Sequence, residues 1–333
     1  MKICLVTDAW APQMNGVVRT LFRTREELAA LGHAVSVVSP DQFFSLACPT
    51  YPEIRLALFA GRKVAARLAA LAPDAVHIST EGPLGIAARR YCLAQGLPFT
   101  TAYHTRFPEY VAARFAVPPG WTYAWLRRFH AAAWSVMVAT ASIEADLQGR
   151  GFANIRRWSR GVDTQLFRPG DKAFLDLPRP IHLYVGRVAV EKNIEAFLAL
   201  DLDGSKVVVG DGPQLAELRR KYPAVRFLGA KTGEELAHHY AAADVFVFPS
   251  RTDTFGLVVL EALACGLPVA AFPVAGPKDI LAGGHAGALD LDLKAAIVRA
   301  LAVPPAACRA WAERYTWRAA TEQFLANLAP IPH

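Results

Sequence analysis

Short apolar runs alternate with helical patterns along almost the whole chain, and this alternation restricts the fold more than any other feature. In the first half, strand-like runs end near Asp8, Ile78 and Tyr103, and amphipathic segments separate them. A proline-containing stretch at 162–180 follows, and the alternation then starts again at Ile181. Strands that alternate with helices predict parallel sheets with helices on both faces. We therefore expect an α/β chain with two doubly wound domains.

The length supports this division, because 333 residues are about twice the size of a typical single domain. We expect an N-terminal Rossmann-like domain over 1–165 and a C-terminal one over 166–310. The helical stretch Ala306–Leu328 ends the pattern, and we expect a helix within 311–333 to return to the N-terminal domain. In doubly wound sheets, ligands bind beyond the carboxyl ends of the strands. The sequence therefore predicts a site in a cleft between two facing domains.

Charge and hydropathy restrict the partners and the compartment. The net charge of +7 favours anionic partners, but Lys and Arg are scattered, which argues against a nucleic-acid-binding tract. The mean hydropathy is +0.22, yet the most apolar candidate span, Ala131–Ile143, is too short to cross a bilayer. Five widely spaced cysteines without a C-x-x-C pair are typical of a reducing cytoplasm. We expect a cytoplasmic protein, with a peripheral position on the cytoplasmic face of the inner membrane compatible with these features.

The segment Tyr184–Asn193 carries the first candidate site. A strand ends at Gly186, Arg187 follows it directly, and Lys192 lies five positions further on. Arginine offers a bidentate fork and lysine a point charge, so the pair suits a diphosphate beyond the end of a strand. An exposed loop with two solvated cations is the alternative.

A glycine turn ends the next strand. Gly210 and Gly212 flank Asp211 and permit close backbone approach to a ligand. The dinucleotide fingerprint needs a third glycine and a following helix, which this segment lacks. An ordinary tight turn is the alternative here, and a nicotinamide dehydrogenase is disfavoured.

The segment Phe248–Val269 carries the strongest pattern. A strand ends at Ser250, a loop contains Asp253, and a helix is expected to begin at Gly256. Free amides at a helix start form an anion site, while Asp253 and Glu261 suit sugar hydroxyls. The alternative is an Asp253 that caps the helix and a Glu261 that is solvated.

Taken together, these motifs resemble the large family of retaining nucleotide-sugar glycosyltransferases with the GT-B fold. That family carries a glutamate, seven residues and a second glutamate, and Asp253 and Glu261 occupy these positions with the first side chain one methylene shorter. The resemblance implies two Rossmann-like doubly wound parallel-sheet domains that face each other across a cleft. It also implies a nucleoside-diphosphate sugar as co-substrate, without a cofactor or a metal.

The resemblance also assigns roles in the second half of the chain. Arg187 and Lys192, after Gly186, would hold the donor diphosphate, Gly210 and Gly212 would form the donor-binding turn, and Glu261 would hold the ribose. Asp253 would contact the transferred sugar together with backbone amides. Those amides belong to Thr254, Phe255, Gly256 and Leu257.

The first half agrees with the same family. Residues 8–21 resemble its first loop, in which Gly16 would approach the donor phosphates. His104 directly follows a strand, where family members carry a histidine that faces the reacting centre; a structural histidine is the alternative. Residues 160–169 resemble the signature that connects the family's two domains.

The finer resemblance is to members that glycosylate membrane lipids, including sulfoquinovosyl- and glycosyl-diacylglycerol synthases and lipid mannosyltransferases. Aromatic and basic residues interleave over 121–129, as in an interfacial helix. An ordinary core helix with Arg127 and Arg128 on its outside explains the pattern equally well.

From these resemblances we expect a hexose to move from a UDP- or GDP-linked donor to a lipid at an anionic membrane surface, with retention of configuration. A soluble or polysaccharide glycan acceptor, or a non-catalytic nucleotide-sugar-binding protein, are the alternatives.

Two D-x-D tripeptides, 201–203 and 290–292, are similar to the motif of metal-dependent glycosyltransferases. Such tripeptides are common by chance, and the adjacent His238 and His239 diverge on a helix, so we expect no metal site.

Overall fold

The computed structural model describes residues 1–13, 15–48, 51–109 and 117–332, without the side chains of 51–54. The chain forms two compact units, one of Met1–Arg160 with Trp317–His333 and one of Gly161–Thr316. The first unit therefore ends at Arg160, five residues before the expected boundary at 165. The segment that returns to it begins at Trp317 rather than at the expected residue 311. The segment between Gly161 and Pro180 belongs to the second unit.

The N-terminal unit is built on a parallel sheet of six strands in the order β2-β1-β5-β6-β7-β8. The strands are β1 (Lys2–Val6), β2 (Ala34–Val38), β5 (Ala75–Ile78), β6 (Thr100–Tyr103), β7 (Ser135–Val138) and β8 (Ile155–Arg157). All residues of β5, β6 and β7 are buried, as expected for strands covered by helices on both faces. The predicted doubly wound sheet is therefore confirmed for this half.

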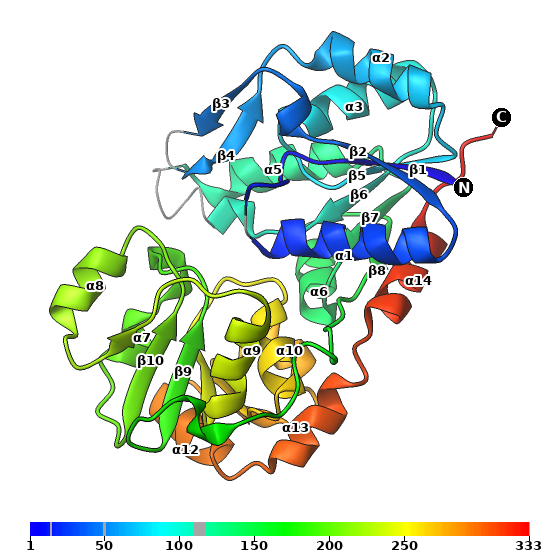
Figure 1. Ribbon diagram of the computed structural model, residues 1–333. Helices are drawn as coiled ribbons and strands as arrows, with labels where there is room; N and C mark the ends of the chain where they lie inside the picture. Colours follow the sequence, from blue (N-terminus) through cyan, green and yellow to red (C-terminus); the bar gives the residue numbers. More distant parts are fainter. Residues whose placement is uncertain (14, 49–50, 110–116, 333) are drawn as a thin grey trace. The chain divides into compact units, whose positions relative to one another are not determined.

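The helices of this unit are α1 (Gly16–Ala30), α2 (Gly61–Leu71), α3 (Pro83–Ala94), α5 (Pro119–His130), α6 (Ala141–Gly149) and α14 (Trp317–Asn327). A short 3-10 turn (Pro40–Gln42) precedes an antiparallel hairpin, β3 (Ser45–Cys48) and β4 (Tyr51–Ala57), that the sequence patterns did not reveal. Helix α14 lies beside α1 (Figure 1), and its Phe324 packs in one core with Leu21 and Trp158. The end of the chain thus completes the N-terminal core.

The C-terminal unit contains a second parallel sheet, in the order β11-β10-β9-β12-β13-β14. Its strands are β9 (Ile181–Val185), β10 (Ser205–Val209), β11 (Arg226–Phe227), β12 (Val245–Phe248), β13 (Val269–Ala271) and β14 (Gly287–Leu289). This is the Rossmann order, in which the first and fourth strands are neighbours at the point where the winding reverses. The fold class predicted from the sequence is confirmed.

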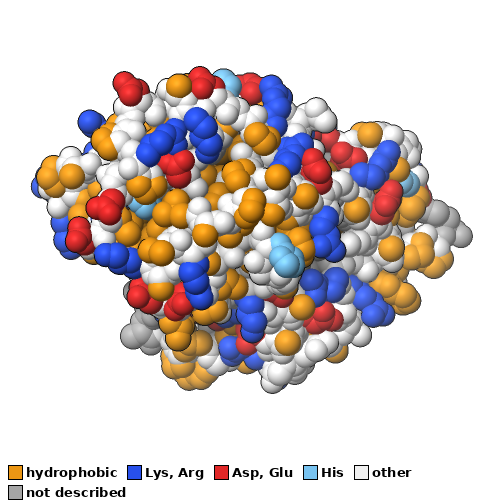
Figure 2. All heavy atoms as spheres, turned by 90° about the horizontal axis from the view of Figure 1, so that it is seen from below, with side chains coloured by type: hydrophobic (Ala, Val, Ile, Leu, Met, Phe, Trp, Pro, Cys, Tyr) orange, Lys and Arg blue, Asp and Glu red, His pale blue; other side chains and the backbone are white. Residues whose placement is uncertain are grey.

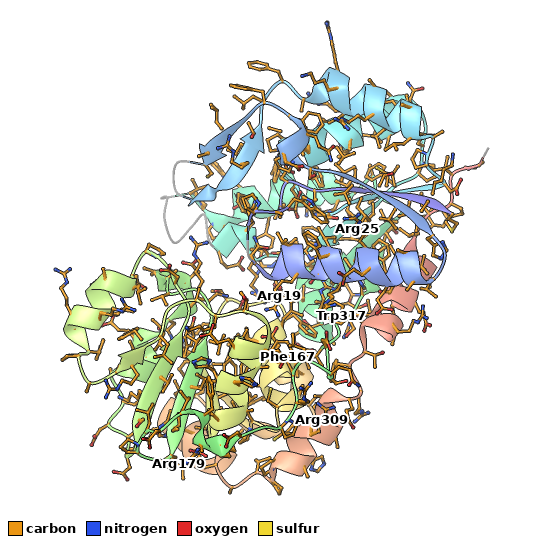
Figure 3. The ribbon with its side chains drawn as sticks, in the orientation of Figure 1. Arg19, Arg25, Phe167, Arg179, Arg309 and Trp317 are labelled. Atoms are coloured by element: carbon orange, nitrogen blue, oxygen red, sulfur yellow. The ribbon has the colours of Figure 1, made fainter. Side chains whose placement is uncertain are left out.

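The helices of the second unit are α7 (Glu195–Leu198), α8 (Leu215–Lys221), α9 (Gly233–Ala242), α10 (Leu257–Ala264), α11 (Pro277–Ile280), α12 (Leu293–Ala300) and α13 (Pro305–Ala312), with 3-10 turns at Lys172–Phe174 and Val190–Lys192. The stretch Ala306–Leu328 is thus two helices, α13 and α14, rather than one. Arg309 of α13 donates to the carbonyl oxygens of Thr164, Phe167 and Ala264, which fastens the segment after Gly161 to this unit (Figure 3). Among the described helices, none is long and apolar enough to cross a membrane.

Candidate functional site

The predicted donor residues of the C-terminal unit gather at the point where its sheet reverses direction. Strands β9 and β12 are hydrogen-bonded neighbours; Gly186 and Arg187 directly follow β9, and the loop with Asp253 follows β12. Ligands of open α/β sheets bind outside the carboxyl ends of strands at such a switch point. The fold therefore places these residues at the expected edge of the sheet.

Lys192 and Asp253 bind each other at this edge. The Lys192 Nζ lies 2.6 Å from Asp253 Oδ1, and the two side chains are 22% and 16% exposed. Asp253 does not cap α10, because that cap is Gly256 and no described side chain bonds there. The buried Asp253 Oδ2 has no hydrogen-bond partner among the described residues. Asp253 is thus not a helix cap, and Lys192 is not a simply solvated cation. The buried Oδ2 keeps acceptor capacity that a ligand hydroxyl can use only when neighbouring groups move aside.

Helix α10 begins next to this ion pair. Gly256 has a φ of +91°, and a Cβ there would lie 3.2 Å from the Phe248 ring. Phe255 is buried, so only its backbone can face a ligand, whereas Thr254 and Leu257 are half-buried. The start of α10 carries no side-chain cap from the described part of the chain. Its first amides therefore suit an anion or a sugar hydroxyl.

Glu261 is held inside the unit rather than solvated. It is 3% exposed, and the hydroxyl of the fully buried Tyr240 on α9 donates to its Oε2 at 3.0 Å. A buried carboxylate needs such donors to remain in place. The alternative of a solvated Glu261 is wrong, and Tyr240 is a supporting residue that the sequence patterns missed.

The glycine turn has a packing reason of its own. A Cβ on Gly210 would lie 1.8 Å from the Gly186 carbonyl oxygen, and one on Gly212 would lie 2.3 Å from that of Val188. The amide of Val188 donates to the Asp211 carbonyl at 2.8 Å. The two loops after β9 and β10 thus touch backbone to backbone. This contact holds the segment of Arg187 in place, and Tyr184 donates to the Arg187 carbonyl at 2.8 Å as well.

In the N-terminal unit, the first loop is anchored by Asp8. Its carboxylate accepts from the Thr80 hydroxyl at 2.8 Å and the Leu84 amide at 2.9 Å, so the loop after β1 is tied to the start of α3. Burial raises the pKa of Asp8, and these hydrogen bonds oppose that shift. Gly16 is exposed at the start of α1, where Asn15 caps the helix. Met14 of this motif lies outside the described residues.

His104 directly follows β6, as predicted, and it meets a residue that the sequence patterns did not single out. Arg160 Nη2 lies 3.2 Å from His104 Nδ1, and Arg160 is 4% exposed. Burial, the charge of Arg160 and His77 all hold the pKa of His104 well below its usual range. Burial also lowers the pKa of Arg160 to about 9. The available signal was the position of Arg160 at the start of the signature at residues 160–169, to which no role beside His104 was assigned. Tyr110, at the end of the His104 motif, lies outside the described residues.

Helix α5 has one buried face and one exposed face over the segment 121–129, and the interfacial role of this segment stays a prediction. Tyr123, Leu126 and Phe129 are buried in the unit, while Trp121 and Trp125 are 76% and 42% exposed. Arg127 and Arg128 are also exposed. The helix has a core face, and its outer surface presents two tryptophans and two arginines.

The acidic side chains of the tripeptide 290–292 have structural roles. Asp292 caps α12 by accepting from the Lys294 amide at 2.9 Å, and Asp290 pairs with Arg299 at 2.7 Å. His239 Nδ1 lies 2.6 Å from the Glu235 carbonyl oxygen. Within the described ranges, no group of three His, Cys, Asp or Glu side chains could hold a metal ion.

A pocket of about 470 Å³ opens at the opposite edge of the C-terminal sheet. It is lined by Lys172, Arg179, Asp244, Pro268 and Leu301, among others, and Arg179 is labelled in Figure 3. Several of these residues precede β9, β12 or β13, so the pocket lies at the amino ends of the strands, away from Lys192 and Asp253. On the face shown in Figure 2, lysines and arginines lie among apolar side chains rather than in one basic band.

Comparison with known proteins gives matches over both halves. The sequence model described as Glycosyltransferase Family 4 matches residues 14–166, and that described as Glycosyl transferases group 1 matches residues 179–303. A GDP-mannose-dependent alpha-mannosyltransferase of Mycobacterium tuberculosis is 31% identical over 87% of this chain and 83% of its own length. The sulfoquinovosyl transferase SQD2 of Arabidopsis thaliana is 31% identical over 89% of this chain and 67% of its own.

The fold has a match among solved structures as well. Sucrose-phosphate synthase from Thermosynechococcus elongatus superposes with a TM-score of 0.77 and 26% identity, over 98% of this chain and 97% of that one.

Proposed function

We propose that this chain, which belongs to the glycosyltransferase family formed by glycosyl transferases group 1 and family 4, moves a hexose from a UDP- or GDP-linked donor to a membrane lipid. The transfer retains configuration and needs no metal. The observation that carries the proposal is the ion pair of Lys192 and Asp253 at the switch point. Arg187 lies five residues before Lys192 in the same loop region after β9.

The chemistry follows from what this edge of the sheet offers. As the bond between sugar and diphosphate breaks, negative charge develops on the leaving group. Arg187, Lys192 and the first amides of α10 are fixed donors that can stabilise that charge. Asp253 and Glu261 accept from hydroxyls, Asp253 on the transferred sugar and Glu261 on the ribose. The acceptor hydroxyl attacks on the face of the leaving group and passes its proton to the departing diphosphate oxygen, so configuration is retained.

The lipid acceptor rests on the outer surface of α5. Trp121, Trp125 and Arg128 are spaced at i, i+4 and i+7 and therefore share one face of the helix. Tryptophan inserts at the headgroup level of a bilayer, and arginine is attracted by anionic lipids. A peripheral position on an anionic membrane surface fits this face. Sulfoquinovosyl transferase SQD2 is among the similar proteins. Its name says that it transfers a sulfoquinovosyl group.

We expect Arg127→Glu together with Arg128→Glu to lower the affinity for anionic phospholipid vesicles by at least about 30-fold. Each basic residue near such a surface contributes about 1 kcal/mol, and 2 kcal/mol corresponds to about that factor. Co-sedimentation at low and high salt measures the binding, and transfer of labelled sugar into the lipid extract measures the consequence. Both side chains are exposed, so we expect thermal stability to be kept.

Arg219 and Arg220 of α8 supply the matched control, because they are also adjacent and exposed on a helix. Their double reversal changes the net charge equally and leaves vesicle binding as in the wild type. Wild-type protein that ignores anionic vesicles at low salt, or equal losses in both double variants, would contradict a membrane-facing α5.

We expect transfer to continue unchanged in excess chelator. In this proposal the two cations and the start of α10 carry the role that a divalent ion has in metal-dependent transferases. Release of nucleoside diphosphate with and without EDTA measures this. Activity that is lost in EDTA and restored by magnesium or manganese would show that a metal takes part.

A soluble glycan or sugar-phosphate acceptor is the second candidate. The match to sucrose-phosphate synthase over nearly the full length of both chains favours it, since that name does not denote a lipid product. If the rate of transfer to soluble sugars exceeds the rate of transfer to vesicle lipids, the acceptor is a soluble sugar.

A further inference from the structure

Arg160 and His104 form a pair whose hydrogen bond can run in one direction only. Arg160 Nη2 and His104 Nδ1 are 3.2 Å apart. A guanidinium group has five N–H donors and no acceptor. Nδ1 must therefore accept, which leaves the single proton of a neutral imidazole on Nε2.

The surroundings of Arg160 keep this direction fixed. Its Nη1 donates to the carbonyl oxygens of Trp158 at 2.5 Å and Ser159 at 2.9 Å. The guanidinium lies 4.2 Å from the centre of the Trp158 ring, and Trp158 is fully buried. The side chain is therefore held from several sides, and rotation away from His104 would leave a buried cation without this acceptor.

We propose that Arg160 is a positioning residue that locks His104 as a neutral Nε2–H donor. The inference deepens the proposed function: the role of the Nε2–H group toward a substrate oxygen rests on that function. The arrangement is the reverse of a carboxylate on Nδ1–H, which makes Nε2 a proton acceptor. With Arg160 on Nδ1, the ring can donate to a ligand oxygen but cannot take a proton from the acceptor hydroxyl.

The position of the pair fits a role toward substrate oxygen atoms. His104 directly follows β6, and Arg160 lies just beyond β8 in the same unit. Nε2 is itself buried, so a ligand oxygen reaches it only when neighbouring groups move aside. Among the described residues, Arg160 and His77 are titratable groups that lower the pKa of His104, and the pKa of His77 is itself lowered to about 3, mainly by burial.

The test is ¹⁵N NMR of histidine side chains in the full-length protein, which needs no donor and no activity. We expect His104, assigned by loss of its signals in His104→Gln, to show a protonated Nε2 and an unprotonated Nδ1. This state should persist from about pH 8 down to about pH 5.5, below the ordinary histidine pKa. In Arg160→Met, the Nδ1 position should become accessible to a proton and the tautomers should mix. Arg157→Met, an exposed arginine on β8, should leave the wild-type spectrum.

Kinetics give a second readout. Glutamine keeps an N–H donor but cannot titrate, so His104→Gln should retain about tenfold more kcat/KM than His104→Ala, the value of one hydrogen bond. Equal losses in both variants, a protonated Nδ1 in the wild type, or a His104 that titrates near its ordinary pKa would each overturn the lock. If the NMR result holds and no transferase activity is found, the proposed function fails while the tautomer assignment stands.

Discussion

Replacement of Arg187 or Lys192 by alanine is expected to lower kcat/KM by about 10²–10³-fold, or about 3–4 kcal/mol of transition-state stabilisation, as for loss of one fixed electrostatic donor. Lys192→Ala should have the larger effect. It removes the cation and also leaves Asp253, which is 16% exposed, without its partner at 2.6 Å. Initial rates with varied donor concentration measure both variants.

The matched control for Lys192 is Lys221→Ala, because Lys221 is more than half exposed and pairs with the surface residue Glu195. Surface pairs of this kind contribute little, so this variant should keep wild-type kinetics. Circular dichroism should show that all variants are folded. Wild-type kcat/KM in both Arg187→Ala and Lys192→Ala would remove the phosphate clamp from the account.

Gly210→Ala is expected to lower the free energy of unfolding by about 2–5 kcal/mol. Two costs add, a left-handed backbone of about 1–2 kcal/mol for a residue with Cβ and an overpacking cost of about 1–3 kcal/mol. The φ of Gly210 is +150°, and its Cβ would lie 1.8 Å from the Gly186 carbonyl oxygen. Urea unfolding followed by circular dichroism measures the loss.

Gly229→Ala separates the two costs. Its φ is +73°, but no atom lies within 4 Å of the added Cβ, so the backbone cost of about 1–2 kcal/mol should remain alone. Equal losses in the two variants would mean that the loops after β9 and β10 need no such close contact.

The fold could be predicted because the apolar periodicity is strong in both halves. Mostly apolar runs such as Ile181–Val185 and Val245–Phe248 are strands in which every residue is buried. Buried strands that alternate with helices along the chain leave few alternatives to a doubly wound sheet. β7, β8, β14 and the β3–β4 hairpin were missed. β14 has three residues and begins at Gly287, so its place in the sheet depends on its pairing with β13 rather than on its own pattern.

The candidate site could be predicted where its residues directly follow strands, as Arg187 and His104 do. Their partners could not be predicted, because Tyr240 and Arg160 meet Glu261 and His104 only through tertiary packing. The sequence separation is 21 residues for the first pair and 56 for the second. Gly210 and Gly212 likewise could be predicted only in part. Their turn is visible in the sequence, but the carbonyl oxygens that exclude a side chain belong to another loop.

The most direct test of a nucleotide-sugar-dependent transferase is mass spectrometry of products. Purified protein is incubated with GDP-mannose, UDP-glucose and related donors, together with anionic vesicles that contain diacylglycerol, and Lys192→Ala serves as the matched variant. We predict that one donor yields a hexosylated lipid and an equal amount of nucleoside diphosphate, and that Lys192→Ala lowers both together. Donor binding without either product, across all donors and with soluble sugars as well as lipids, would contradict the account and would identify a nucleotide-sugar-binding protein without transferase activity.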